Sequence, residues 1–319
     1  MTITSRRNLL YGLLALAVAG VVMARTLSLF PPYIDDIIGR SFPLVLVILG
    51  LSVLLRNRIP FSSFIAVLLS AALITAITTT AFSVRRGQNR DDNRIEVTEN
   101  LGETVALLRV RVSTLATDVE FAQAPAGSDR QVRALFVGST ENALDDLYLE
   151  SPDGGATFTI TELRTNPLPM LEAIGRGTLL VELPPDTGID IQLDAADGDV
   201  TMNLADINLE RLNLNIVEGD ALITLPEYAA AFSTPDETLG TWRVGTGALT
   251  VRIPEDVSAR FDMSQSVGLD PEYDPNVYNL LFGRDVLEAR NIDLAEIVMR
   301  YNLIVQRDRL NVTVTEDNP

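Results

Sequence analysis

The residues best suited to chemistry in this sequence are acidic. The run DAADGD (Asp194–Asp199) places three aspartates around one glycine, as a calcium-binding loop does. An EF-hand loop also needs a glutamate six residues after its glycine, but Leu204 stands there. The pattern therefore favours a solvated turn, with weak calcium binding at the edge of a sheet as the alternative.

A second candidate is SPDGGATF (Ser151–Phe158), which resembles the Asp-box pattern S-x-D-x-G-x-T-F of sialidase-like propellers. In those proteins too the pattern is a hairpin turn, and they repeat it, whereas this chain has one copy. A hairpin turn is the expected role here, and a carbohydrate-acting enzyme is the weaker alternative.

The composition argues against catalysis. The 319 residues include no Cys and no His, which removes thiolate nucleophiles, disulfides and the usual general base and metal ligand. No G-x-S-x-G, P-loop or dinucleotide-binding fingerprint occurs. We therefore expect no enzyme, and we assign no catalytic, cofactor-binding or metal-binding residue.

Charge is distributed unevenly along the chain, whose formal net charge is −18. Residues 1–94 carry ten arginines and four aspartates, for a net +6, so the remainder carries −24. A domain this acidic repels phosphate backbones, which excludes nucleic acid as an expected partner.

Three charge-free stretches near the N-terminus predict transmembrane helices at about 8–24, 38–55 and 59–84. Small residues four apart, at Ala66–Ser70 and Ala72–Ala76, permit close helix packing and a homo-oligomer. The segment SRRNLL (Ser5–Leu10) also resembles a twin-arginine export signal. Two further spans follow it, so an anchor for the first helix is the preferred interpretation.

Arginines at the ends of these spans predict the orientation. Arg6 and Arg7 place the N-terminus in the cytoplasm, and Arg56 and Arg58 place the second connection there. Because the chain then crosses the membrane three times, the domain that follows is predicted to lie on the extracytoplasmic side. Arg85 and Arg86 favour the opposite orientation, so the first helix decides the prediction.

The C-terminal two-thirds repeats a strand-turn-strand unit. Counting from Gly219, apolar residues follow at +2, +4 and +6, and Pro226 stands at +7. The same spacing, proline included, follows Gly177 and Gly247; it also follows Gly198, with Ala205 in the place of the proline, and a shorter match follows Gly154. Upstream, position −5 is apolar at Leu193, Leu214 and Trp242, and position −3 at Ala195, Ile216 and Val244. A last copy centres on Asp308.

This periodicity predicts stacked units, each of which buries its apolar face against its neighbours. The expected fold is a set of N-terminal transmembrane α-helices followed by an all-β domain, either a β-solenoid or a toast-rack-like repeat. An ordinary antiparallel sandwich is the alternative. Residues 1–86 form the predicted membrane region, 87–94 a linker, and 95–319 the acidic β domain. Residues 263–300 interrupt the repeat and predict an insertion or edge cover with a short helix near 285–291.

Two segments carry a likeness to a known family. Residues 8–58 resemble the paired transmembrane unit of LiaF-like bacterial membrane proteins, with Phe42-Pro43-Leu44 opening the second helix and Leu49-Gly50-Leu51 continuing it. The glycine-punctuated strands from Gly177 to Pro254 are similar to the toast-rack, or adhesin-like, β domain that follows such helices. Three spans, and Asp308 in the place of a last glycine, depart from the pattern.

The resemblance implies a component of the bacterial envelope stress response that acts with a membrane sensor kinase and restrains its signalling. It supplies no catalytic residue. The function expected from the sequence is therefore a membrane-anchored, non-enzymatic regulatory or sensing module that binds another membrane protein. A surface-displayed adhesin-like or structural protein is the alternative.

Overall fold

The computed structural model describes residues 87–128, 130–165, 174–227, 230, 237–266, 269, 271–281, 283, 285–306 and 309–315. The chain divides into two compact units, and the β domain is the unit formed by Asn89–Thr165 and Gly175–Pro319. The three predicted membrane helices lie outside the described residues. Among those that are described, no helix is both long and apolar enough to span a bilayer.

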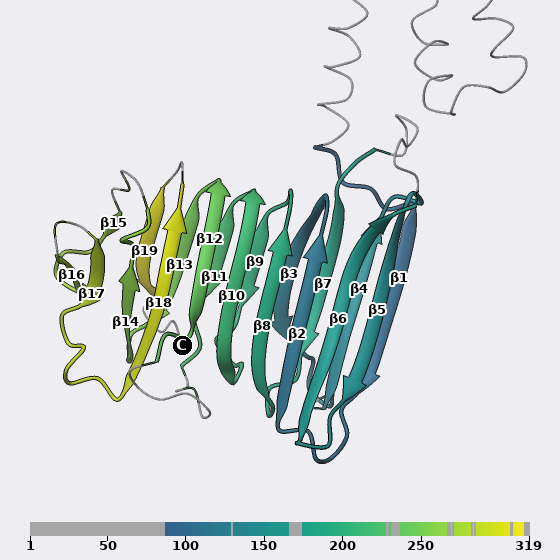
Figure 1. The fold of residues 1–319 in the computed structure, drawn as a ribbon, viewed down its shortest axis with the longest axis horizontal. Coiled ribbons are helices and arrows are strands. Elements are labelled where there is room, and N and C mark those ends of the chain that lie inside the picture. The colour runs from purple at the N-terminus through teal and green to yellow at the C-terminus, as the bar shows by residue number, and fades with distance from the viewer. Residues whose placement is uncertain are drawn as a thin grey trace, which may run out of the picture. The chain divides into compact units, whose positions relative to one another are not determined.

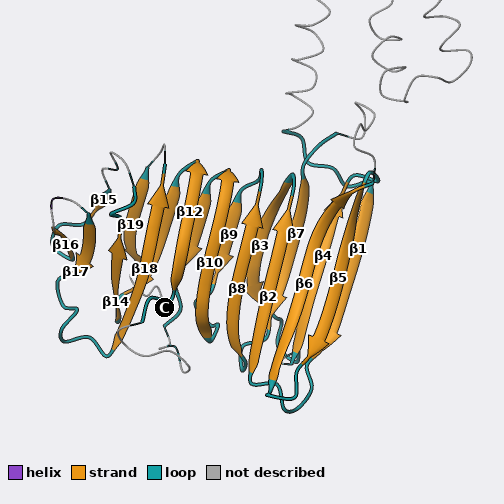
Figure 2. Ribbon diagram, in the orientation of Figure 1, coloured by secondary structure: helices purple, strands orange, loops and turns teal. Residues whose placement is uncertain are grey.

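The β domain consists of two sheets packed face to face (Figures 1 and 2). The nine-stranded sheet has the order β1 (Asn93–Asn100), β4 (Gln131–Gly138), β7 (Gly177–Leu183), β3 (Thr117–Gln123), β9 (Val200–Asn203), β11 (Ala221–Thr224), β13 (Leu249–Pro254), β19 (Leu310–Thr315) and β15 (Glu272–Tyr273). The ten-stranded sheet has the order β16 (Tyr278–Leu281), β17 (Val286–Ala289), β14 (Val257–Asp262), β18 (Ile297–Val305), β12 (Gly240–Thr246), β10 (Leu209–Glu218), β8 (Gly188–Ala195), β2 (Leu107–Thr114), β6 (Gly155–Arg164) and β5 (Asn142–Glu150). β1 begins two residues before the predicted domain boundary at 95.

From β7 to β14, successive strands alternate between the two sheets, so that one strand from each sheet makes up one coil of the chain. Corresponding strands of neighbouring coils pair in parallel. β8, β10 and β12 align Leu193, Leu214 and Trp242 across the ten-stranded sheet. β9, β11 and β13 align Met202, Ile223 and Val251 across the other. The predicted repeat register is therefore confirmed for these coils. The parallel pairing contradicts the antiparallel sandwich, although antiparallel strands do close both ends of the stack.

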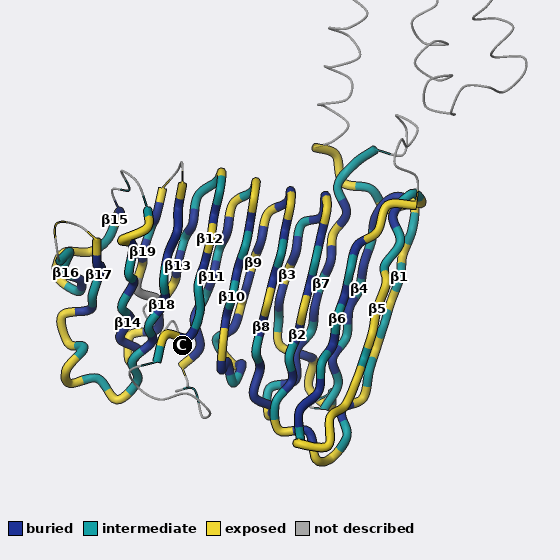
Figure 3. Tube along the Cα trace, in the orientation of Figure 1, coloured by how far each residue is buried: buried dark blue, intermediate teal, exposed yellow. Residues whose placement is uncertain are grey.

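Alternation along each strand builds the core, because successive side chains of a strand point to opposite faces. β10, for example, buries Leu212, Leu214 and Ile216 and turns its intervening residues outward. Figure 3 shows this alternation of buried and exposed residues throughout the stack. Between β12 and β18, the ring of Trp242 lies 4.3 Å from that of Tyr301 between centroids.

The order of coils in space differs from their order in sequence. Gly177 and Gly198 are 21 residues apart, as Gly198 and Gly219 are, yet the strands that follow Gly177 and Gly198 are not neighbours. Instead β3 lies between β7 and β9 and pairs with both in parallel. The first coil of the chain thus occupies the middle of the stack, and a repeat spacing alone cannot reveal such an insertion.

The segment after Gly154 is also placed differently from the other repeats. Strands that follow Gly198, Gly219 and Gly247 begin at a corner and enter the nine-stranded sheet. β6, which follows Gly154, instead forms an antiparallel hairpin with β5 in the ten-stranded sheet. The apolar spacing is the same in both settings because any half-buried strand requires it.

Residues 263–300 extend both sheets at the β15–β17 end. β15 pairs with β19, and β16 and β17 pair with each other beside β14. An edge cover was expected, but the short helix predicted near 285–291 is wrong, since β17 occupies Val286–Ala289. Val286, Leu287 and Ala289 of this strand are buried, which overrides any local preference for helix.

Candidate functional site

Stacked glycines line the corner at which the chain passes from the ten-stranded to the nine-stranded sheet. Gly198, Gly219 and Gly247 have φ of 151°, 142° and 130°. A Cβ on Gly219 would lie 2.0 Å from the carbonyl oxygen of Gly198, and one on Gly247 equally close to that of Gly219. Only glycine fits, because both the backbone conformation and the spacing between coils exclude a side chain.

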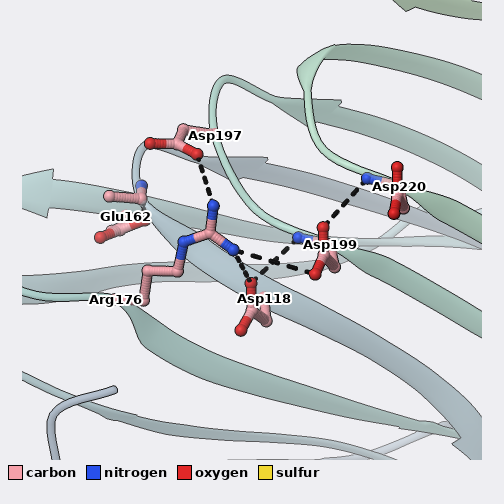
Figure 4. A network of polar contacts seen from close by, with 7 residues as sticks. Asp118, Glu162, Arg176, Asp197, Asp199 and Asp220 are labelled. Carbon is pink, nitrogen blue, oxygen red and sulfur yellow. Dashed lines mark hydrogen bonds and ion pairs between the residues drawn. The ribbon is translucent and has the colours of Figure 1, made fainter. Parts of the chain in front are cut away.

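Asp118, together with Asp199 and Asp220 next to two of these glycines, forms a second column at this corner, shown in Figure 4. Asp118 accepts a hydrogen bond from the backbone N–H of Asp199 at 3.0 Å, and Asp199 accepts one from Asp220 at 3.0 Å. Asp220 in turn accepts from Ala248 at 2.8 Å. Each carboxylate therefore binds the backbone of the next coil, which fixes the stacking register. The repeated Gly-Asp dipeptides at 198–199 and 219–220 were the available sequence signal.

Arg176 closes this column at the β7 side. Its guanidinium lies 3.2 Å from the carboxylate of Asp118, 3.0 Å from that of Asp197 and 3.9 Å from that of Asp199. The Asp197 side chain is 6% exposed and that of Arg176 is 23% exposed, so these contacts are partly shielded from solvent. The arginine thus neutralises the end of the acidic column where the repeat of Gly-Asp stops.

Glu162 caps the corner between β2 and β3, where no Gly-Asp pair occurs. Its Oε2 accepts hydrogen bonds from the backbone N–H groups of Leu115 at 2.6 Å and Ala116 at 3.2 Å, and from Thr117 Oγ1 at 2.8 Å. Its Oε1 accepts from Asn142 Nδ2 at 2.7 Å. Glu162 is 3% exposed, and sequence reasoning missed it because it lies 45 residues from the corner that it caps.

The aspartates of DAADGD are thus engaged within the protein. Asp194 accepts from Asn215 Nδ2 at 3.1 Å, while Asp197 and Asp199 take part in the corner column. Within the described ranges, no group of three or more acidic side chains is arranged to hold a metal ion. The segment does form a turn, as predicted, but Asp197 is buried and paired with Arg176 rather than solvated.

SPDGGATF forms the tip of the β5–β6 hairpin. Ser151 N–H donates to the carbonyl of Gly155 at 2.8 Å, and Gly154 N–H donates to that of Ser151 at 3.2 Å. With Gly154 at φ 81°, these bonds define a G1 bulge. Hydrogen bonds from Ser151 and from the N–H of Gly155 lower the pKa of Asp153. The segment therefore has the predicted role of a hairpin turn.

The two ends of the stack are the remaining surfaces of interest. At the β15 end, a cavity of about 570 Å³ is lined by Pro254, Glu255, Val257, Glu272, Tyr273, Asp274, Val277, Ala289, Asn291, Asn311, Val312 and Thr313. At the other end, the strands β1 and β5 terminate the two sheets. Leu147 and Leu149 on β5 are 52% and 57% exposed, and Leu163 on β6 is 46% exposed. Three leucines are therefore exposed at this end, beside the acidic side chains of β5; elsewhere in the described residues Leu115, Val217 and Leu294 are also exposed.

Comparison with known proteins supports the fold. No family model and no curated protein matches the chain. Among solved structures, a proposed cell adhesion protein from Clostridium sporogenes matches with a TM-score of 0.54 at 12% identity, covering 70% of this chain and 100% of that one. A proposed adhesin from Bacteroides fragilis matches with a TM-score of 0.27 at 8% identity, covering 72% of this chain and 100% of that one. The first likeness shows that the β domain shares its β-repeat fold with that structure.

Proposed function

We propose that this chain is a membrane-anchored, non-enzymatic module that acts by binding another protein of the bacterial envelope. The observation that carries the proposal is the contrast between its two kinds of surface. The carboxylates of the corner column are used to join coils, whereas Leu147, Leu149 and Leu163 at the β5 end are exposed and without an evident structural role. Exposed apolar surface of this kind marks interaction sites.

The predicted helices at 8–24, 38–55 and 59–84 would hold the β domain at the cell membrane. Their arginine pattern favours an extracytoplasmic β domain. In the regulatory form of the proposal, the partner is a membrane protein such as a sensor kinase, as the LiaF-like character of residues 8–58 implies. The lipid bilayer is then the second partner. The proposal includes no nucleic-acid partner.

An adhesin-like role is the second candidate. Its support is the likeness of the β domain to the proposed cell adhesion protein from Clostridium sporogenes. In this form the partner lies on another cell or on a surface, and the membrane helices serve only as an anchor. The two candidates differ in where the partner resides, which makes them separable by experiment.

The test is affinity purification of the full chain from native membranes after mild cross-linking. Recovery of a membrane protein, and of a sensor kinase in particular, supports the regulatory form. The adhesin-like form is supported if no membrane partner is recovered and if intact cells that carry the chain bind to other cells or to matrix. Glycosidase activity of the purified chain above background would contradict both, because it would revive the enzymatic alternative suggested by SPDGGATF.

A further inference from the structure

We propose that the open edge of β5 binds an extended segment of another protein in which apolar and basic side chains alternate. The segment joins the ten-stranded sheet as an additional strand beside β5. The inference rests on the proposed function, since it names the surface that binds the partner and the chemistry of the partner's segment.

The backbone of β5 is available along one side. Among the described residues, β5 pairs only with β6. The hydrogen bond from Ser151 N–H to Gly155 sets the alternation of this antiparallel pair, so that odd-numbered residues of β5 bond to β6. The backbone groups of Leu144, Asp146 and Tyr148 then point away from β6. The carbonyl of Asn142, which has the same parity, accepts from Asn93 Nδ2 at 3.3 Å on that side.

Apolar side chains flank this free edge on both faces. The odd-numbered residues Leu147 and Leu149 point outward and are more than half exposed. The even-numbered residues Leu144 and Tyr148 pack on the edge of the core and are only partly buried. From the facing sheet, Ile95 and Val97 of β1 also pack on the core and are partly buried. An added strand would therefore meet apolar surface on both faces, with its apolar side chains on one face and the aliphatic stems of its basic side chains on the other.

The negative charges at the β5 edge favour an added strand that carries basic side chains. Asp145 and Asp146 lie exposed in the middle of β5, and Glu150 lies exposed at its end. Burial, the hydrogen bond to Glu150 and, to a smaller extent, the charge of Glu99 on β1 raise the pKa of Tyr148 at this edge. Basic side chains in the added strand would meet these carboxylates. The carboxylates also explain why the edge can remain open, because exposed charges discourage unspecific strand pairing.

A second copy of this chain does not satisfy these requirements. Pairing of β5 with β5 of another copy would bring Asp145 and Asp146 of both chains together in one small area. Each domain also carries a net charge of −24, since residues 1–94 carry +6 of the total −18. Like charges facing each other across paired strands are destabilising, so a basic partner segment is the better occupant.

The test uses the full chain in a neutral detergent and a fluorescently labelled nine-residue peptide that alternates valine and arginine. Fluorescence anisotropy should show binding that weakens as salt is added. A peptide with glutamate in place of arginine should not bind. Equal binding of the glutamate peptide would overturn the proposal, and so would failure of the arginine peptide to bind.

Asp146→Pro isolates the contribution of the backbone. Proline removes the N–H of residue 146, which points to the open edge, and it is tolerated at such positions because the β5–β6 bonds remain. Asp146→Ser is the matched control, since it removes the same charge and keeps the N–H. We expect the proline variant to bind the arginine peptide at least tenfold more weakly than the serine variant. Equal affinities of these two variants would refute strand addition.

The same preparations also provide controls for folding and for self-association. The fluorescence of Trp242, which is the single tryptophan and is fully buried, reports whether each variant is folded. If Asp146→Pro does not fold, the double variant Leu147→Asn and Leu149→Asn replaces it, with an expected loss of affinity of at least fivefold. A dimer of the unliganded chain that Asp146→Pro dissociates would assign the edge to a second copy and overturn the proposal.

Co-purification separates this inference from the proposed function. A membrane partner that is recovered equally with wild type and with Asp146→Pro would show that binding occurs elsewhere on the chain. The proposed function would then stand and the β5 edge would be the wrong surface. Loss of that partner from the proline variant, with retention by Asp146→Ser, is the result expected here.

Discussion

Gly198, Gly219 and Gly247 show how single residues determine the distance between coils. Their Cα atoms face carbonyl oxygens of the preceding coil so closely that a methyl group has no room. The sequence pattern located all three glycines as turn residues. It did not reveal the contact between them, because that contact joins coils and depends on their stacking order.

Gly219→Ala should destabilise the β domain by about 3 kcal/mol or more, since it adds both backbone strain and a clash with the carbonyl of Gly198. Gly127→Ala is the matched control. Gly127 also has a positive φ, of 93°, but nothing lies within 4 Å of the position that a Cβ would take there, so strain of about 1 kcal/mol is its whole cost. Unfolding in denaturant, monitored by the fluorescence of Trp242, measures the free energy of unfolding of both variants. Equal losses of stability in the two variants would contradict the predicted clash at Gly219.

Ile223→Asp and Thr224→Asp test the inward and outward faces of one strand. Ile223 is fully buried between Met202 and Val251, so its replacement buries an unpaired carboxylate and should cost several kcal/mol, roughly 4 or more. Thr224 points outward next to Arg252, so its replacement should cost less than about 0.5 kcal/mol. Similar shifts of the melting temperature for both would refute the register.

Asp190 provides a prediction about pH. Burial raises the pKa of this carboxyl, and nearby Arg211, Arg109 and Arg111 only partly oppose the rise. A raised folded-state pKa means that its contribution to stability is present below the unfolded pKa of about 3.9 and is lost as pH rises through the folded pKa. Asp190→Asn should therefore unfold at a higher temperature than wild type at pH 7 and at the same temperature below about pH 4. A pH-independent difference would contradict this assignment.

At the scale of elements, the β2–β3 corner shows where the repeat was not predictable. The spacing of glycines correctly predicted the coils β8–β9, β10–β11 and β12–β13, because each buries alternate residues in a common register. The corner at Leu115–Thr117 has no glycine and was not recognised as a repeat. The strand β3 that follows this corner lies between β7 and β9, and the corner itself donates hydrogen bonds to Glu162, which is distant in sequence.

Glu162→Ala should weaken this corner more than an equivalent change on the surface. The substitution leaves the buried N–H of Ala116 and the side chains of Thr117 and Asn142 without their acceptor. Buried groups without partners cost about 1–3 kcal/mol each, so we expect a loss of about 3 kcal/mol. Glu120→Ala, at an exposed position of β3, is the control and should change stability by less than about 0.5 kcal/mol. Hydrogen exchange of the Leu115 and Ala116 amides would show that the loss is local to the corner.

At the scale of the whole molecule, the sequence was informative about the class of fold and uninformative about the partner. Alternation of apolar residues specifies which strands are half-buried, and the all-β repeat domain follows from it. The exposed edge of β5 could not be recognised in this way. Asp145, Asp146 and Leu147 are an irregular run in sequence, and their exposure follows only from the terminal position of β5 in the sheet.

The side of the membrane on which the β domain lies is testable because the chain contains no cysteine. Asp186 is an exposed turn residue before β8 and is a better reporter than Asp220, whose carboxylate accepts from Ala248. The positions of Arg6, Arg7, Arg56 and Arg58 predict an extracytoplasmic β domain. In intact cells, Asp186→Cys should react with a membrane-impermeant maleimide, whereas Asn57→Cys, between the second and third predicted helices, should react only after lysis. The reverse labelling pattern would place the β domain in the cytoplasm, and the basic segment that binds β5 would then have to belong to a cytoplasmic part of the partner.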